Sequence, residues 1–168
     1  MLKSFAPVAD GHTKILVVGT MPGEASLKAG QYYAYKYNHF WPLISVLFNG
    51  GNPFNSYQQK LLILLKNSVG LWDSLKYCRR KGSLDKDIKA EMPNNFALLF
   101  KKYPSIKRIV FNGQAAQRFY KSHNPALPDY EYILMPSTSP ANASKSFQEK
   151  LSLWRQALII NPSDKFGC

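Results

Sequence analysis

The stretch that decides the fold is ILVVGTMPG, residues 15–23. Its first four residues form an uninterrupted apolar run, and the next five include a proline and two glycines, which favour a turn. Continuous apolarity over a short, β-branched run predicts a strand buried on both faces, as in a parallel sheet covered by helices. Three further runs have the same character, at residues 70–72, 106–111 and 132–135.

The segments between these runs have the features of helices. Ser56 is placed to cap a helix that ends near residues 66–67, and either Asn94 or Asn95 to cap the next. A third helix is expected from residues 112–113 onward. Apolar residues at 147, 151, 154 and 158 share one face of a fourth. Alternating strands and helices predict a three-layer α/β fold with right-handed crossovers, in one domain spanning residues 1–168.

The composition restricts the function classes. The 168 residues carry a formal net charge of +12, which favours nucleic acid as the partner, although such charge also serves solubility alone. No apolar run is long enough to cross a membrane and no leader is visible, so we expect a cytoplasmic protein, near the nucleoid in a bacterium or archaeon. Cys78 and Cys168 are too few for a zinc or iron–sulfur site and are expected to be free thiols.

The residues that follow the four predicted strands should meet at one rim, because carboxyl ends of parallel strands share an edge. Small and polar loops there let backbone N–H groups approach a ligand. The sequence lacks the glycine-rich nucleotide motifs and the G-x-S-x-G nucleophile motif, which argues against a nucleoside triphosphate site and a serine hydrolase. The candidate rim residues are Met21, Pro22, Gly23, Asp73, Asn112, Ser137, Thr138, Ser139 and Asn142.

The connection at residues 19–41 is long enough to suggest a functional loop. It contains four tyrosines and then Asn38-His39-Phe40-Trp41. Flat aromatic side chains in a basic protein favour contact with nucleic-acid bases. The polar segment at residues 76–92, with RRKGS at residues 79–83, is expected to be the longest surface excursion. Either the cations of this segment contact phosphates, or the segment is a solvated loop. The solvated loop is favoured.

These motifs together resemble a known family. GTMPG, AGQYYA, NHFW, GLWD, GSLD, FNG and MPSTSPAN are similar to those of the uracil-DNA glycosylase superfamily, and more narrowly of its hypoxanthine (deoxyinosine) DNA glycosylase branch. The similarity runs from about Ile15 to the final helix. It implies a three-layer α/β/α sandwich with a short, mostly parallel four-stranded sheet. It also implies a monomer that excises deaminated bases from DNA without metal or cofactor.

The resemblance also implies site residues. Met21 occupies the position where most branches have an Asn or Asp that directs a water molecule, and the deoxyinosine branch places this task on the residue that is Asn38 here. The alternative for Asn38 is to cap a helix that begins near Phe40. Tyr33 is expected to stack on the extruded base, with Tyr32 nearly as plausible.

Discrimination of the base needs a donor for the carbonyl of hypoxanthine and an acceptor for its N1–H. Backbone amides at residues 21–23 could donate, and Asp73 or the side-chain carbonyl of Asn112 could accept. Asp73 could equally cap a helix. The fourth loop is expected to grip the phosphates that flank the target, through Ser137, Thr138, Ser139 and Asn142.

The sequence thus predicts a monofunctional glycosylase that hydrolyses the N-glycosidic bond of deoxyinosine, and also acts on uracil or xanthine. Two alternatives remain. One is a mismatch-specific uracil or thymine glycosylase, against which Met21 argues because that chemistry uses a polar residue there. The other is a non-catalytic nucleic-acid-binding α/β domain, for which charge and aromatic residues would suffice.

Overall fold

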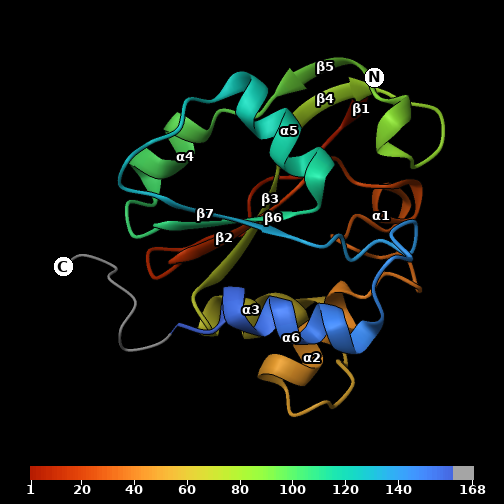
Figure 1. The fold of residues 1–168 in the computed structure, drawn as a ribbon, viewed down its shortest axis with the longest axis vertical. Helices are drawn as coiled ribbons and strands as arrows, with labels where there is room; N and C mark the ends of the chain where they lie inside the picture. Colours follow the sequence, from red (N-terminus) through yellow and green to blue (C-terminus); the bar gives the residue numbers. More distant parts are fainter. Residues whose placement is uncertain (161–168) are drawn as a thin grey trace.

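The computed structural model describes residues 1–160 and is built around a four-stranded parallel sheet (Figure 1). The sheet order is β3-β2-β6-β7, and all three strand pairs are parallel. These strands are the four apolar runs expected from the sequence, with slightly shifted ends. Their bounds are β2 (Ile15–Gly19), β3 (Val69–Asp73), β6 (Arg108–Asn112) and β7 (Glu131–Met135).

Helices cover both faces of this sheet, which confirms the three-layer α/β/α prediction (Figure 1). Side chains of β2 alternate between the two cores: Val17 packs with Trp154 on one face, and Val18 packs with Phe111 on the other. One face holds α2 (Phe40–Phe48), α3 (Tyr57–Lys66) and α6 (Phe147–Leu158). The other holds α4 (Phe96–Lys102) and α5 (Gln114–His123).

Polar side chains cap the N-termini of α3 and α4. The hydroxyl of Ser56 accepts from the Gln59 backbone amide and starts α3. Asn95 caps α4 by accepting from Leu98, whereas Asn94 is buried and its amide donates to the carbonyls of Asp73 and Leu75. Of the two asparagines considered from the sequence, Asn95 is therefore the cap, and Asn94 fastens the end of β3.

A second sheet corrects the expectation of a solvated loop at residues 76–92. It has three antiparallel strands in the order β1-β4-β5, namely β1 (Leu2–Lys3), β4 (Leu75–Arg79) and β5 (Lys89–Pro93), with the short 3₁₀ helix η1 (Asp85–Asp87) between the last two. Its pairing register is irregular, so the buried residues Leu75 and Cys78 lie three apart rather than two. All of β5 is exposed. The alternating pattern that reveals a strand is therefore missing.

The long connection after β2 also contains a helix that the sequence did not indicate, α1 (Glu24–Ala29). Only Ser26 of its six residues is buried, so it has no apolar face to produce a periodic pattern. The remaining tyrosine-rich part leads directly into α2. Cys78 is a buried free thiol, and Cys168 lies outside the described residues. No helix within residues 1–160 is long and apolar enough to span a membrane.

Candidate active site

A cavity of about 540 Å³ opens at the carboxyl ends of the parallel strands. Its walls come from the loops after β2, β3, β6 and β7, together with the tyrosine-rich segment and the turn between β4 and β5. Of the residues expected at the site, all but Asn142 line this cavity, and Asn142 lines the neighbouring groove. The predicted rim residues therefore lie around one cavity, although they are up to about 120 positions apart in the chain.

Asn38 lies at the end of the tyrosine-rich segment, where α2 begins. Its backbone N–H donates to the Tyr35 carbonyl at 2.8 Å, and its Oδ1 accepts from the Phe40 backbone N–H at 2.9 Å. The adjacent His39 N–H donates to the carbonyl of Thr138 in the fourth loop. Asn38 thus starts α2 with an Asx turn and also lines the cavity. A carbonyl oxygen has two lone pairs, so Oδ1 retains one acceptor site.

Tyr33 forms an aromatic wall of the cavity. It has φ of 54°, a conformation that costs free energy in a residue with a side chain. Its ring stacks on Phe40 with centroids 4.1 Å apart and planes at 29°. Its buried hydroxyl has no hydrogen-bond partner among the described residues, and burial, followed by the charge of Asp73, raises the pKa of this hydroxyl.

Tyr32, the alternative for the stacking residue, packs in the hydrophobic core. It is 3 % exposed. Its hydroxyl donates to the Ala6 carbonyl at 3.2 Å, and its own carbonyl accepts from the Trp41 indole N–H at 2.8 Å. These contacts anchor the segment. Of Tyr32 and Tyr33, only Tyr33 has a hydroxyl without a hydrogen-bond partner among the described residues.

Asp73 is a buried carboxyl at the cavity wall. Its Oδ2 accepts from the Ser4 hydroxyl at 2.5 Å, and Oδ1 lies where a Cβ on Gly19 would come within 2.6 Å, so only glycine fits opposite it. Burial raises the pKa of Asp73 from 3.8 to about 7; the Ser4 hydrogen bond opposes this rise, and the nearby Asp85 adds to it. β4 follows Asp73 almost directly, so the alternative of a helix cap is wrong.

Asn112 and Thr138 hold each other. The Asn112 Nδ2 donates to Thr138 Oγ1 at 2.9 Å, and Asn112 Oδ1 accepts from the Thr138 backbone N–H at 2.8 Å. Thr138 is fully buried, and Asn112 engages both its hydroxyl and its backbone N–H. This pair fixes the fourth loop. Gly113 lets that loop approach, because a Cβ there would lie 2.9 Å from Ser137 Cβ.

The other polar residues of the fourth loop are accessible to solvent but also bond within the loop. The Ser137 hydroxyl accepts from the Ser139 N–H at 3.2 Å, the Ser139 hydroxyl from the Ala141 N–H at 3.3 Å, and the Asn142 amide donates to the Ser137 carbonyl at 3.3 Å. Successive turns of this kind keep the loop compact above the cavity.

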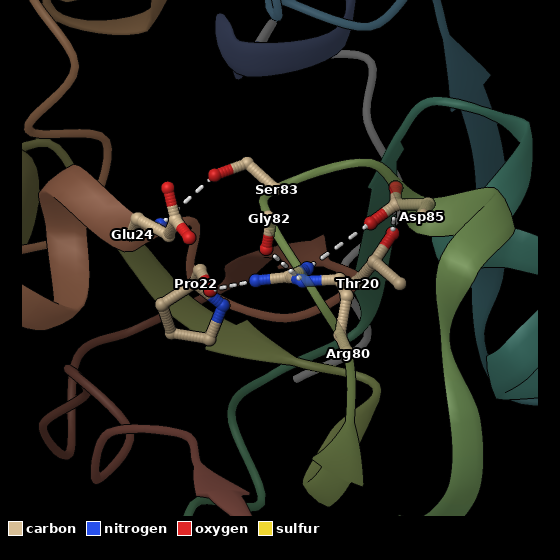
Figure 2. Close-up of polar contacts among 7 residues, drawn as sticks. All are labelled: Thr20, Pro22, Glu24, Arg80, Gly82, Ser83 and Asp85. Carbon is tan, nitrogen blue, oxygen red and sulfur yellow. Dashed lines mark hydrogen bonds and ion pairs between the residues drawn. The ribbon is translucent and has the colours of Figure 1, made fainter.

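The turn between β4 and β5 forms a wall that the sequence did not indicate. Arg80 is its centre, with a fully buried side chain (Figure 2). Its Nη2 donates to the Pro22 carbonyl, its Nε donates to the Gly82 carbonyl at 3.0 Å, and its Nη1 lies 3.6 Å from Asp85 Oδ1. A guanidinium can serve three acceptors in one plane, so Arg80 joins the second sheet to the first-strand loop.

Two further bonds close this wall (Figure 2). The Ser83 hydroxyl accepts from the Glu24 backbone N–H at 3.0 Å, and the Thr20 hydroxyl donates to Asp85 Oδ2 at 2.9 Å. Burial raises the pKa of Asp85. The only signal for this wall in the sequence was the GSLD motif at residues 82–85. Nothing distinguished Arg80 from its charged neighbours.

The side chain of Met21 lies among apolar side chains. It is 7 % exposed and packs with Leu75, Cys78 and Phe119 between the first-strand loop and the second sheet. It therefore supports the cavity wall, and it supplies no polar atom to a bound water. Within residues 1–160, no group of three or more His, Cys, Asp or Glu is arranged to hold a metal ion.

Comparisons with known proteins agree on one family. A model described as "Uracil DNA glycosylase superfamily" matches residues 6–158. A protein of Methanosarcina barkeri (strain Fusaro / DSM 804) described as "Hypoxanthine DNA glycosylase" is 34% identical over 157 residues, covering 92% of this chain and 96% of the relative. A protein of the same description from Methanosarcina acetivorans is 35% identical over 142 residues, covering 83% and 87%.

A solved structure has the same fold. It is the solution NMR structure of a Methanosarcina acetivorans protein described as a candidate uracil DNA glycosylase. The TM-score is 0.73 at 32% sequence identity, and the match covers 92% of this chain and 97% of that one. The similarity therefore extends over nearly the whole of both chains.

Proposed function

The chain belongs to the uracil DNA glycosylase superfamily, and from this premise we propose that it removes deaminated bases from DNA, with hypoxanthine in deoxyinosine as the principal substrate. Uracil and xanthine are further substrates of the same site. Water replaces the base at C1′, so the products are a free base and an abasic site. The enzyme acts as a monomer in the cytoplasm and needs no cofactor. The curated relatives described as hypoxanthine DNA glycosylases support the choice of base.

The observation on which this proposal depends is that Tyr33 and Asn38 come from one segment and line one cavity. An enzyme that acts on a base within a duplex must extrude the nucleotide into a pocket, where the base stacks on aromatic side chains. Phe40 covers one face of Tyr33, which leaves the other for the base.

Asn38 is proposed to orient the attacking water. Cleavage of the N-glycosidic bond leaves positive charge on the sugar and negative charge on the base, so positioned dipoles lower the barrier. The free acceptor site of Asn38 Oδ1 can hold a water beneath C1′, while its other site keeps α2 in place. The apolar packing of Met21 supports this assignment over the mismatch-specific alternative, which needs a polar group at that position.

The base is proposed to be distinguished by its N1–H and C6 carbonyl edge. Asp73 accepts from N1–H, because a carboxyl offers an acceptor oxygen in either protonation state. The backbone N–H groups of Met21 and Gly23 donate to the carbonyl, since Pro22 has no N–H. The single carbonyl oxygen of Asn112 already accepts from Thr138, whereas Asp73 has a second carboxyl oxygen besides the one that accepts from Ser4, which makes Asp73 the better acceptor of the two candidates.

The test is excision from duplexes that contain a single inosine, uracil or xanthine, followed by alkali and detection of nicked strand. Asn38→Ala should lower the single-turnover rate on inosine by about 10² to 10⁴, the usual range for loss of a positioned polar catalyst. Asn38→Ser keeps an oxygen for the start of α2 but does not reach the water, so it should be equally impaired. A wild-type protein that binds these duplexes without nicking any would instead establish the non-catalytic alternative.

Asn95→Ala is the matched control, since it removes a helix-capping asparagine from α4 that does not line the cavity. It should lose about 1 kcal/mol of stability and no activity. Equal activity losses in Asn38→Ala and Asn95→Ala would reduce Asn38 to a helix cap.

A further inference from the structure

A second groove, of about 550 Å³, lies against the cavity. The two share Asn38 and Pro140 in their linings, so the groove continues beyond Asn38 on the side away from the base. Its walls come from residues 36–39 and from the end of the fourth loop, and its floor comes from α6.

The two spaces differ in the charged residues that line them. The cavity is lined by Glu24, Asp73 and Asp85, and by no lysine or arginine. The groove is lined by Lys36, Lys145 and Lys150, and by no acidic residue. A phosphodiester is attracted to the second space, whereas an uncharged base can enter the first. Asn38 lies at the boundary between them.

Lys150 gives the groove a cation that has no counter-ion among residues 1–160. It is 1 % exposed, and its Nζ donates to the Asn142 carbonyl at 2.9 Å. The salt bridges of residues 1–160 join Arg80 to Asp85 and Arg108 to Glu131, so Lys150 is in neither. A buried charge without an opposite charge is costly. A phosphate in the groove would supply that opposite charge.

We propose that this groove binds the phosphates of the DNA strand on one side of the extruded nucleotide, with Lys36 and Lys145 at its rim and Lys150 beneath. The inference rests on the proposed function and adds the path of the strand to it. The base lies in the acidic cavity, the phosphates lie in the basic groove, and the sugar between them comes to Asn38. The exposed Tyr37 ring, 4.7 Å from the Lys36 ammonium, adds a flat surface along the same path.

The first test compares two double variants in fluorescence anisotropy titrations of labelled duplex, with and without inosine, between 50 and 200 mM salt. Each lost phosphate contact lowers the slope of log affinity against log salt by about 0.9. Lys36→Gln with Lys145→Gln should therefore lower the slope by about 1.8. Lys101→Gln with Lys102→Gln removes the same charge from exposed positions on α4 and should keep the wild-type slope. Equal slopes for the two double variants would overturn the proposal.

The second test is Lys150→Met, which retains the buried stem and removes the charge. The slope should fall by about 0.9, and an unchanged slope in a folded variant would exclude Lys150 from phosphate binding. If Lys150→Met does not fold, the rim variants decide the question. These titrations require no catalysis, so they separate the two proposals. Absence of excision by the wild type defeats the proposed function, whereas slopes that ignore the groove lysines defeat the strand path alone.

Discussion

Asp73→Asn should make the protein more stable above neutral pH. The folded carboxyl has a pKa of about 7 against an ordinary value of 3.8. Below pH 3.8 both states hold the proton. Between the two values the unfolded chain releases it and the folded protein keeps it, so stability falls as pH rises. Each pH unit in that window costs about 1.4 kcal/mol, which gives about 4 kcal/mol by pH 8. Asparagine remains neutral and retains an oxygen for the Ser4 hydroxyl.

The measurement is urea unfolding of wild type and Asp73→Asn at intervals from pH 4 to pH 8. The difference in unfolding free energy should be small at pH 4, increase through the window and level off above pH 7. Subtracting the two curves removes the titration of groups that behave alike in both proteins. Asp129→Asn, at an exposed position, is the control and should stay within about 0.5 kcal/mol of wild type throughout. A pH-independent difference for Asp73→Asn would refute the reasoning.

Three further outcomes are expected. Gly19→Ala places a methyl group 2.6 Å from Asp73 Oδ1 and should abolish excision and lower the Tm, whereas Gly11→Ala, with no atom within 4 Å, should change neither. Arg80→Met should cost about 2 kcal/mol in chemical denaturation because the carbonyls of Pro22 and Gly82 lose their donor, and should raise KM more than it lowers kcat as the wall loosens. Tyr33→Leu should lower single-turnover excision about tenfold, the equivalent of about 1.4 kcal/mol of stacking, with an unchanged circular dichroism spectrum.

The parallel sheet could be predicted from the sequence because its strands are buried on both faces and appear as unbroken apolar runs. The second sheet could not. Its strand β5 (Lys89–Pro93) is wholly exposed, and the register irregularities of β4 (Leu75–Arg79) remove the alternation of buried and exposed residues. Both strands therefore resemble a charged loop in sequence, although β4 pairs with the N-terminal strand on one side and with β5 on the other.

The membership of the site could also be predicted, since parallel strands bring their carboxyl ends to one edge. The task of each residue could not, because it depends on partners distant in the chain. The side chain of Asn112 donates a hydrogen bond to Thr138, which is buried. Arg80 is surrounded by other cations in sequence, and only the fold separates the buried one from the exposed ones. In the same way, only the fold shows that Lys150 lies on the buried face of α6 (Phe147–Leu158).

The bond from Ser4 to Asp73 has a practical consequence for handling the protein. The strand that precedes Ser4 pairs with β4, and the Ser4 backbone N–H donates to the Lys76 carbonyl at 2.9 Å. Removing the first five residues would thus remove the Ser4 hydroxyl that donates to the buried Asp73 carboxyl, together with the edge strand β1 of the smaller sheet.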